Sequence, residues 1–95
     1  MSLAPELALL DAARRALDGG NPARSIALLD QYASEFPRGR LAPEARVLRI
    51  EATAQHGDRA EANRLAREFL RDDPESPHAE RVHRLEAVDG GTSNP

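Results

Sequence analysis

The chain has 95 residues with a net charge of −3, and 40% of them are hydrophobic, which fits one small globular domain. Its basic residues are scattered, unlike those of nucleic-acid-binding proteins, and no apolar stretch approaches the roughly 20 residues of a membrane span. Cysteine is absent and aromatic residues make up only 3%, so Leu and Ala must fill the core.

A pair of helices is predicted before Pro37. The first spans 5–18, because Pro5 suits the opening turn of a helix and Gly19-Gly20 can supply the left-handed residue that ends it. Asn21 is a favourable cap for the second helix. That helix must end before Pro37, since the residue preceding a proline is pushed out of the helical region.

A second helical pair follows with the same signals. The third helix is predicted over 42–56 and ends at Gly57. Asp58 caps the fourth helix, and Glu61 three residues later completes a capping-box pattern. The fourth helix is expected to end before Pro74.

The two ends of the chain are predicted to differ from the paired helices. Residues 1–4 form a lead-in. Ser76-Pro77 can start a fifth helix over 77–88, which begins a third unit and closes the stack as a cap. Residues 89–95 carry no apolar pattern and are expected to form a disordered tail.

The two helical pairs repeat at an offset of 37 residues, the distance from Gly20 to Gly57. Gly20-Asn21 recurs as Gly57-Asp58, and Tyr32 recurs as Phe69. A fixed period of this length marks a stack of like supersecondary units. Such a stack leaves an extended surface for a partner, so the repeat predicts binding rather than catalysis.

Each unit resembles the tetratricopeptide repeat (TPR), a family whose units are pairs of antiparallel helices. The family places a Gly-Asp-like turn between the helices, then a small residue, an aromatic residue and a proline along and after the second helix. The matching residues are Gly20-Asn21, Ser25, Tyr32 and Pro37 in repeat one (5–37), and Gly57-Asp58, Ala62, Phe69 and Pro74 in repeat two (41–74). The resemblance implies an all-α fold, a right-handed α-solenoid of two TPR-like helical hairpin repeats plus a C-terminal capping helix.

The chain departs from the family in the first helix of each unit. Large aromatic residues are expected there, but Leu9 and Arg46 stand at the first such position, and Ala16 and Thr53 at the later one. The period is also longer than the family's usual length of about 34 residues. In this it is similar to a variant found in bacterial envelope proteins, including the outer-membrane assembly lipoprotein and the Tol–Pal coordinator, and to segments of envelope regulators that bind sigma factors.

The resemblance implies a non-enzymatic scaffold or adaptor that binds another protein or peptide, and it names no ligand. The alternative is an oligomerisation module or a regulatory appendage of a larger envelope or sigma-factor-regulating protein. The use of Arg in place of Lys, together with abundant Ala, is typical of a GC-rich bacterial genome. A complete chain would be cytoplasmic, since its N-terminus lacks signal-peptide features, whereas an excised domain would come from a periplasmic or envelope protein.

No group of residues has the spacing of a catalytic, cofactor or metal site. His78 and His83 are five residues apart, with Glu80 between them, whereas paired zinc ligands on a helix are four apart and point the same way. Two histidines facing solvent are the simpler interpretation. We therefore expect no metal, no cofactor and no enzymatic activity.

A local group of arginines has two interpretations. Its members are Arg38, Arg40, Arg46 and Arg49. They could bind phosphate or an acidic partner, because a guanidinium binds carboxylates in a bidentate way. A solvated turn is the favoured interpretation, since Glu44 interrupts the group.

The inward-facing positions of the family define a predicted partner-binding groove. Its residues are Leu7, Leu10, Arg14 and Leu17 from the first helix, and Glu44, Val47, Glu51 and Gln55 from the third. Aliphatic and charged side chains together suit an amphipathic helix laid in a groove. The first helix also lacks an earlier repeat to cover its leucines, so Leu3, Leu7 and Leu10 are the predicted contact of a homodimer. The alternative is that the chain is a fragment or that these leucines simply pack on the second and third helices.

Overall fold

The part of the chain that the structure describes forms five α-helices and no strands. This computed structural model describes residues 2–92, with side chains as far as residue 86. The helices are α1 (Ala4–Asp18), α2 (Pro22–Glu35), α3 (Ala42–Gln55), α4 (Arg59–Asp72) and α5 (Ala79–Thr92). The prediction of an all-α fold is confirmed.

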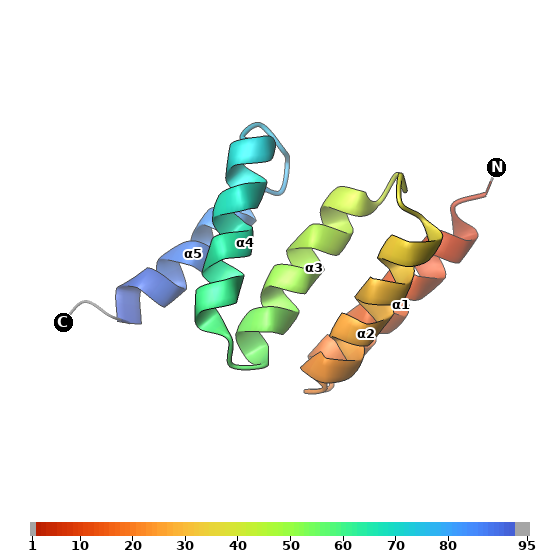
Figure 1. Cartoon of the computed structure of the whole chain (residues 1–95), viewed down its shortest axis with the longest axis horizontal. Helices are drawn as coiled ribbons and strands as arrows, with labels where there is room; N and C mark the ends of the chain where they lie inside the picture. Colours follow the sequence, from red (N-terminus) through yellow and green to blue (C-terminus); the bar gives the residue numbers. More distant parts are fainter. Residues whose placement is uncertain (1, 93–95) are drawn as a thin grey trace.

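Successive helices pack on one another, each running opposite to the one before it (Figure 1). Helix α3 lies in the middle and contacts the four others, whereas among the described residues no contact joins α2 to α4 or α1 to α5. In Figure 1, α1 lies behind α2 and α5 lies behind α4. We call the side formed by α1, α3 and α5 the inner face, and the side formed by α2 and α4 the outer face.

Equivalent signals begin α2 and α4. The side chains of Asn21 and Asp58 each accept a hydrogen bond from the backbone N–H three residues on, at 3.2 and 3.1 Å. Gly20 and Gly57 precede them with φ of +81° and +101°, a left-handed conformation that glycine adopts without a steric penalty. Because helix caps depend on local residues, both boundaries lie where the sequence predicts them.

The capping box predicted at α4 is only half formed. The backbone N–H of Asp58 donates instead to the carbonyl of Thr53 at the end of α3, at 3.1 Å. The Glu61 carboxylate pairs with Arg64 at 2.7 Å. The tight junction between α3 and α4 thus uses the donor that a complete capping box would need.

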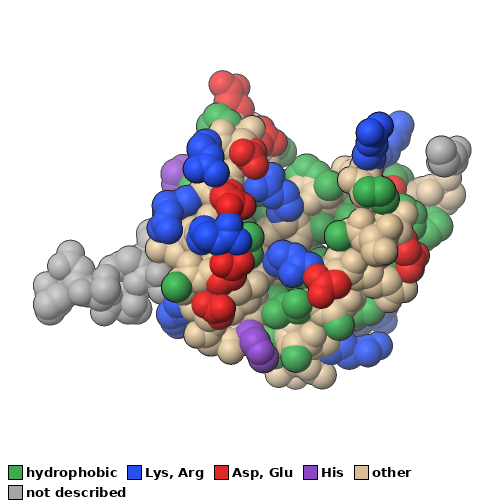
Figure 2. All heavy atoms as spheres, viewed as in Figure 1, with side chains coloured by type: hydrophobic (Ala, Val, Ile, Leu, Met, Phe, Trp, Pro, Cys, Tyr) green, Lys and Arg blue, Asp and Glu red, His purple; other side chains and the backbone are tan. Residues whose placement is uncertain are grey.

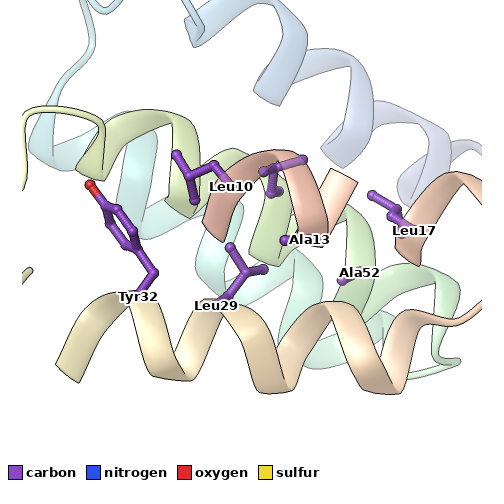
Figure 3. Close-up of a cluster of buried hydrophobic side chains, with 7 residues drawn as sticks. Leu10, Ala13, Leu17, Leu29, Tyr32 and Ala52 are labelled. Atoms are coloured by element: carbon purple, nitrogen blue, oxygen red, sulfur yellow. The ribbon is translucent and has the colours of Figure 1, made fainter. Parts of the chain in front are cut away.

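The core consists of two clusters of buried side chains related by the 37-residue offset. The first, from α1, α2 and α3, contains Leu10, Ala13, Leu17, Leu29, Tyr32, Leu48 and Ala52 (Figure 3). The second, from α3, α4 and α5, contains Val47, Ile50, Ala62, Ala66, Phe69 and Val82. Tyr32 and Phe69 are both buried, at equivalent places, as the repeat predicts.

Arg46 stands where the TPR pattern expects an aromatic residue in α3. Its guanidinium lies over the Phe69 ring, 5.0 Å from the ring centroid, and pairs with Asp72 of α4 at 3.2 Å. A planar guanidinium stacks favourably on an aromatic face. The contact between α3 and α4 therefore keeps one aromatic partner, although α3 supplies none.

Helix α5 begins later than predicted. Ser76-Pro77 forms a turn rather than the first helical residues, and Ser76 Oγ accepts a hydrogen bond from the backbone N–H of His78 at 3.1 Å. The helix begins at Ala79, which is the repeat equivalent of Ala42, the first residue of α3. The register of the repeat, rather than the Ser-Pro signal, decides this boundary.

Helix α5 also ends later than predicted. It continues to Thr92, so residues 89–92 of the expected disordered tail are helical instead. Extending a formed helix by one turn costs far less than starting a new one, which explains how a segment without apolar pattern can continue it. The rest of the predicted tail, 93–95, lies outside the described residues.

Glu6, in the first turn of α1, is a buried carboxylate that ties α1 to its neighbours. Only 8% of the residue is exposed, and its Oε1 accepts hydrogen bonds from Tyr32 Oη at 2.7 Å and from the Leu41 N–H at 3.3 Å. A Cβ placed on Gly39 would lie 2.3 Å from Tyr32 Oη and 2.6 Å from Glu6 Oε1. Gly39 does not have a positive φ, so this position requires glycine for space, not for backbone conformation.

The environment of Tyr32 predicts a late alkaline titration. Burial, the hydrogen bond to Glu6 and the negative charge of Glu6 together raise the pKa of Tyr32 from 10.0 to about 12. Because the pKa of the folded state is the higher one, the stability linked to this proton is complete below pH 10 and is lost as pH rises towards 12.

Tyr32 is the only tyrosine and there is no tryptophan, so tyrosinate absorbance reports this residue alone. At about pH 11 we expect little tyrosinate in the folded protein, against roughly nine-tenths ionisation in urea. Coincident titration curves in the two solvents would contradict the assignment. The Tyr32→Phe variant, without this ionisable group, should lose the added pH dependence of unfolding.

Candidate partner-binding groove

The structure places seven of the eight predicted groove residues around two neighbouring hollows on the inner face, which share Arg14. The first hollow, of about 390 Å³, is lined by Leu7, Leu10, Asp11, Arg14, Leu41, Glu44 and Leu48. The second, of about 420 Å³, is lined by Arg14, Leu17, Asp18, Glu51, Ala54, Gln55 and Leu85. Both hollows combine aliphatic side chains with charged ones.

Val47 is the one predicted groove residue that does not line either hollow. It is 0% exposed and packs in the second core cluster with Phe69 and Val82. The inward position is covered because α5 packs on α3 and contributes Val82 there. A partner therefore cannot contact Val47 while the helices stay packed.

An ion-pair network connects the three helices of the inner face. Glu51 of α3 pairs with Arg81 of α5 at 2.6 Å and with Arg14 of α1 at 3.6 Å. Arg14 also lies 4.0 Å from Asp18. Glu51 is the most enclosed member, with 18% of its side chain exposed. The wall between the two hollows is thus charged, and its charges already have opposite neighbours.

The predicted self-association surface on α1 is reduced by the structure. Leu10 is buried in the first core cluster, where it stabilises the hairpin, and the 5% of it that is exposed is too little for a dimer contact. Leu3 is half-buried. Leu7 is 53% exposed and borders the first hollow, which makes it the accessible apolar residue of this region.

No protein-family model, curated protein or solved structure matches this chain.

The histidines considered as metal ligands lie apart from one another. His78 Nε2 is 3.4 Å from Glu44 Oε2 of α3, whereas Glu80 pairs with Arg84 and His83 is exposed. Among the described residues, no three His, Cys, Asp or Glu side chains are placed to hold a metal ion together. No helix in residues 2–92 has both the length and the apolar character that crossing a membrane requires.

The arginine group predicted near the α2–α3 turn divides into two kinds. Arg46 and Arg49 pair with neighbouring helices, through Asp72 of α4 and Asp30 of α2. Arg38 and Arg40 are exposed on the turn itself. The four guanidinium groups thus do not form one phosphate-binding cluster.

Several residues that line the hollows were missed by the sequence analysis. Leu85 of α5 lines the second hollow, and Arg81 of the same helix pairs with Glu51 of its lining; the family pattern was not extended to α5. The offset could have found them, since Arg81 is the repeat equivalent of Glu44, and Leu85 that of Leu48. It also relates Arg14 to Glu51, so the network joins equivalent positions of successive units.

Proposed function

We propose that this chain is a non-enzymatic protein-interaction module of the TPR type, whose inner face receives a segment of a partner protein. The observation that carries the proposal is the pair of neighbouring hollows, lined by seven of the eight inward positions of the repeat. The layered contacts support it, because α1, α3 and α5 meet in sequence while α2 and α4 stay apart.

The lining of the hollows suits an amphipathic helix. Leu7 offers exposed apolar surface at one end, and at the other the half-buried Leu85 lines the second hollow beside Leu17, of which only 5% is exposed. Leu7 and Leu17 are ten residues apart on α1, a separation of about 15 Å, which a partner helix of about three turns can span. Such helices bind grooves through apolar residues spaced at helical intervals, with polar residues at the rim.

The charged side chains of the inner face fit a binding role better than a catalytic one. Arg14 and Arg81 both pair with Glu51, and Asp18 lies 4.0 Å from Arg14, so the positive and negative charges of this network balance. Carboxylates line both hollows, but no serine, threonine, histidine or cysteine does, so neither lining holds a hydroxyl or thiol nucleophile beside a base. The proposed module accordingly uses no metal and no cofactor, and its partner is a protein or peptide.

The test is to select helical peptides on the full chain from a random display library and to map their binding by amide chemical shifts. We expect shifts on α1 and α3 around the two hollows, and an affinity loss of at least about tenfold for Leu7→Glu, as for a central apolar contact. Ala8→Glu is the matched control, because Ala8 is exposed on the same helix and lines neither hollow. Peptides that bind the outer face, or affinity unchanged in Leu7→Glu, would contradict the proposal.

A further inference from the structure

The two turns that connect one unit to the next have the same backbone structure. We call residues 36–41 turn one and residues 73–78 turn two. In turn one, the Gly39 N–H donates to the Phe36 carbonyl at 3.0 Å, and the Ala42 N–H donates to the Gly39 carbonyl at 3.2 Å. The equivalent bonds of turn two, 37 residues later, measure 3.1 and 2.9 Å. Both turns lie at the same end of the molecule (Figure 1).

The two turns carry opposite charges. Turn one exposes Arg38 and Arg40, whereas turn two exposes Asp73 and Glu75. Within the described part of the chain, none of these four side chains has a hydrogen bond or an ion pair. Figure 2 shows basic side chains projecting at one turn and acidic ones at the other. Equivalent scaffolds therefore present unneutralised charges of opposite sign.

We propose that two copies of this chain associate through this end, with turn one of each copy against turn two of the other. An interface around a two-fold axis must be self-complementary, so that residue i contacts residue j and j contacts i. A two-fold axis midway between the turns meets this condition. It brings Arg38 and Arg40 of each copy to Asp73 and Glu75 of the other.

The same charges exclude a dimer in which each turn meets its own equivalent in the other copy. Turn one against turn one would oppose four guanidinium groups, and turn two against turn two would oppose four carboxylates. Like charges brought together select against such an arrangement. Because the two-fold arrangement uses both turns of both copies, association should stop at a dimer. None of the four charged residues lines the hollows, and of the two turns only Leu41, at the end of turn one, borders one of them, so the charge pairs themselves do not occupy the inner face.

The contact should be weak and sensitive to salt. All four side chains are exposed, and ion pairs between exposed side chains contribute little individually and are screened by added salt. The screening length falls from about 30 Å at 0.01 M to about 3 Å at 1 M ionic strength. We therefore expect a dimer at low salt and high protein concentration, with at least a tenfold lower association constant in about 1 M salt.

Sedimentation equilibrium of two charge-reversal variants tests the proposal. Arg38→Glu/Arg40→Glu makes both turns acidic, and Asp73→Arg/Glu75→Arg makes both basic. Each variant alone should be monomeric, whereas an equimolar mixture should form a heterodimer, since each turn then meets its opposite. The exposed positions should preserve folding, which circular dichroism checks.

Three outcomes would overturn the proposal. The first is a wild-type chain that stays monomeric at about 1 mM in low salt, the range of weak association. The second is a pair of variants that each dimerise as the wild type does, and the third is a mixture that stays monomeric. Leu7→Glu serves as the matched control and should keep the dimer. If Leu7→Glu dissociates the dimer and the charge-reversal variants do not, the contact lies on α1 instead.

Discussion

Truncating Phe69 to Ala should destabilise the fold by about 3–5 kcal/mol, the usual cost of removing a buried aromatic side chain. Phe69 is 1% exposed, packs with Val47 and Ile50, and supports the guanidinium of Arg46. A domain of this size has a total stability of about 5–15 kcal/mol, so the loss is a large share. Tyr32→Ala should cost a similar amount, because Tyr32 fills the equivalent place in the first cluster and pairs with Glu6.

Urea unfolding followed by circular dichroism measures both losses. Phe36 provides the matched control, since it is the remaining aromatic residue and is only partly buried, so Phe36→Ala should cost less. Losses below about 1 kcal/mol at both Tyr32 and Phe69 would mean that the repeat register is wrong, because only exposed positions tolerate such truncation.

Helix boundaries could be predicted wherever the deciding interactions are local. Asn21 and Asp58 cap the helices that follow them, and Pro37 ends the region in which α2 can continue. The predicted start of α5 was wrong because a local signal suggested it. Ser76-Pro77 has the residues of a helix start, but the Ser76 side chain accepts from the His78 N–H within a turn. The equivalent turn of the first unit has Gly39 at this position, which has no side chain, so comparing the two units did not reveal the error in the predicted start of α5.

The candidate groove was predicted better than the contacts that decide which of its residues are accessible. The inward stripe of α1 and α3 follows from helical periodicity, and most of it lines the two hollows. Helical periodicity places Val47 and Glu51 on the same stripe and cannot tell which of them is buried. The burial of Val47 depends on Val82 of another helix. Glu6 has partners 26 and 35 residues away, and a glutamate in the first turn of a helix is ordinarily explained by the helix dipole alone.

Placing serine at position 39 tests the closest contact in the fold. Gly39→Ser should cost about 1–3 kcal/mol, as overpacking does, because its Cβ would meet Tyr32 Oη and Glu6 Oε1 well inside contact distance. Both atoms belong to buried side chains and have little room to move. The second unit shows how the same turn accommodates a serine. There Ser76 stands at the equivalent of Gly39, and Phe69, which lacks the hydroxyl, stands at the equivalent of Tyr32.

The two positions should therefore be coupled. Tyr32→Phe alone should destabilise by about 1–3 kcal/mol, since it removes a buried donor to the Glu6 carboxylate. In the Gly39→Ser background the same substitution should cost much less, because it also removes the hydroxyl that the new Cβ meets. The expected coupling free energy is about 1–2 kcal/mol, within the range for residues in contact. Additive losses in urea unfolding would contradict this. Phe69→Tyr gives the mirror test in the second unit, where the added hydroxyl should be destabilising and Ser76→Gly should relieve it.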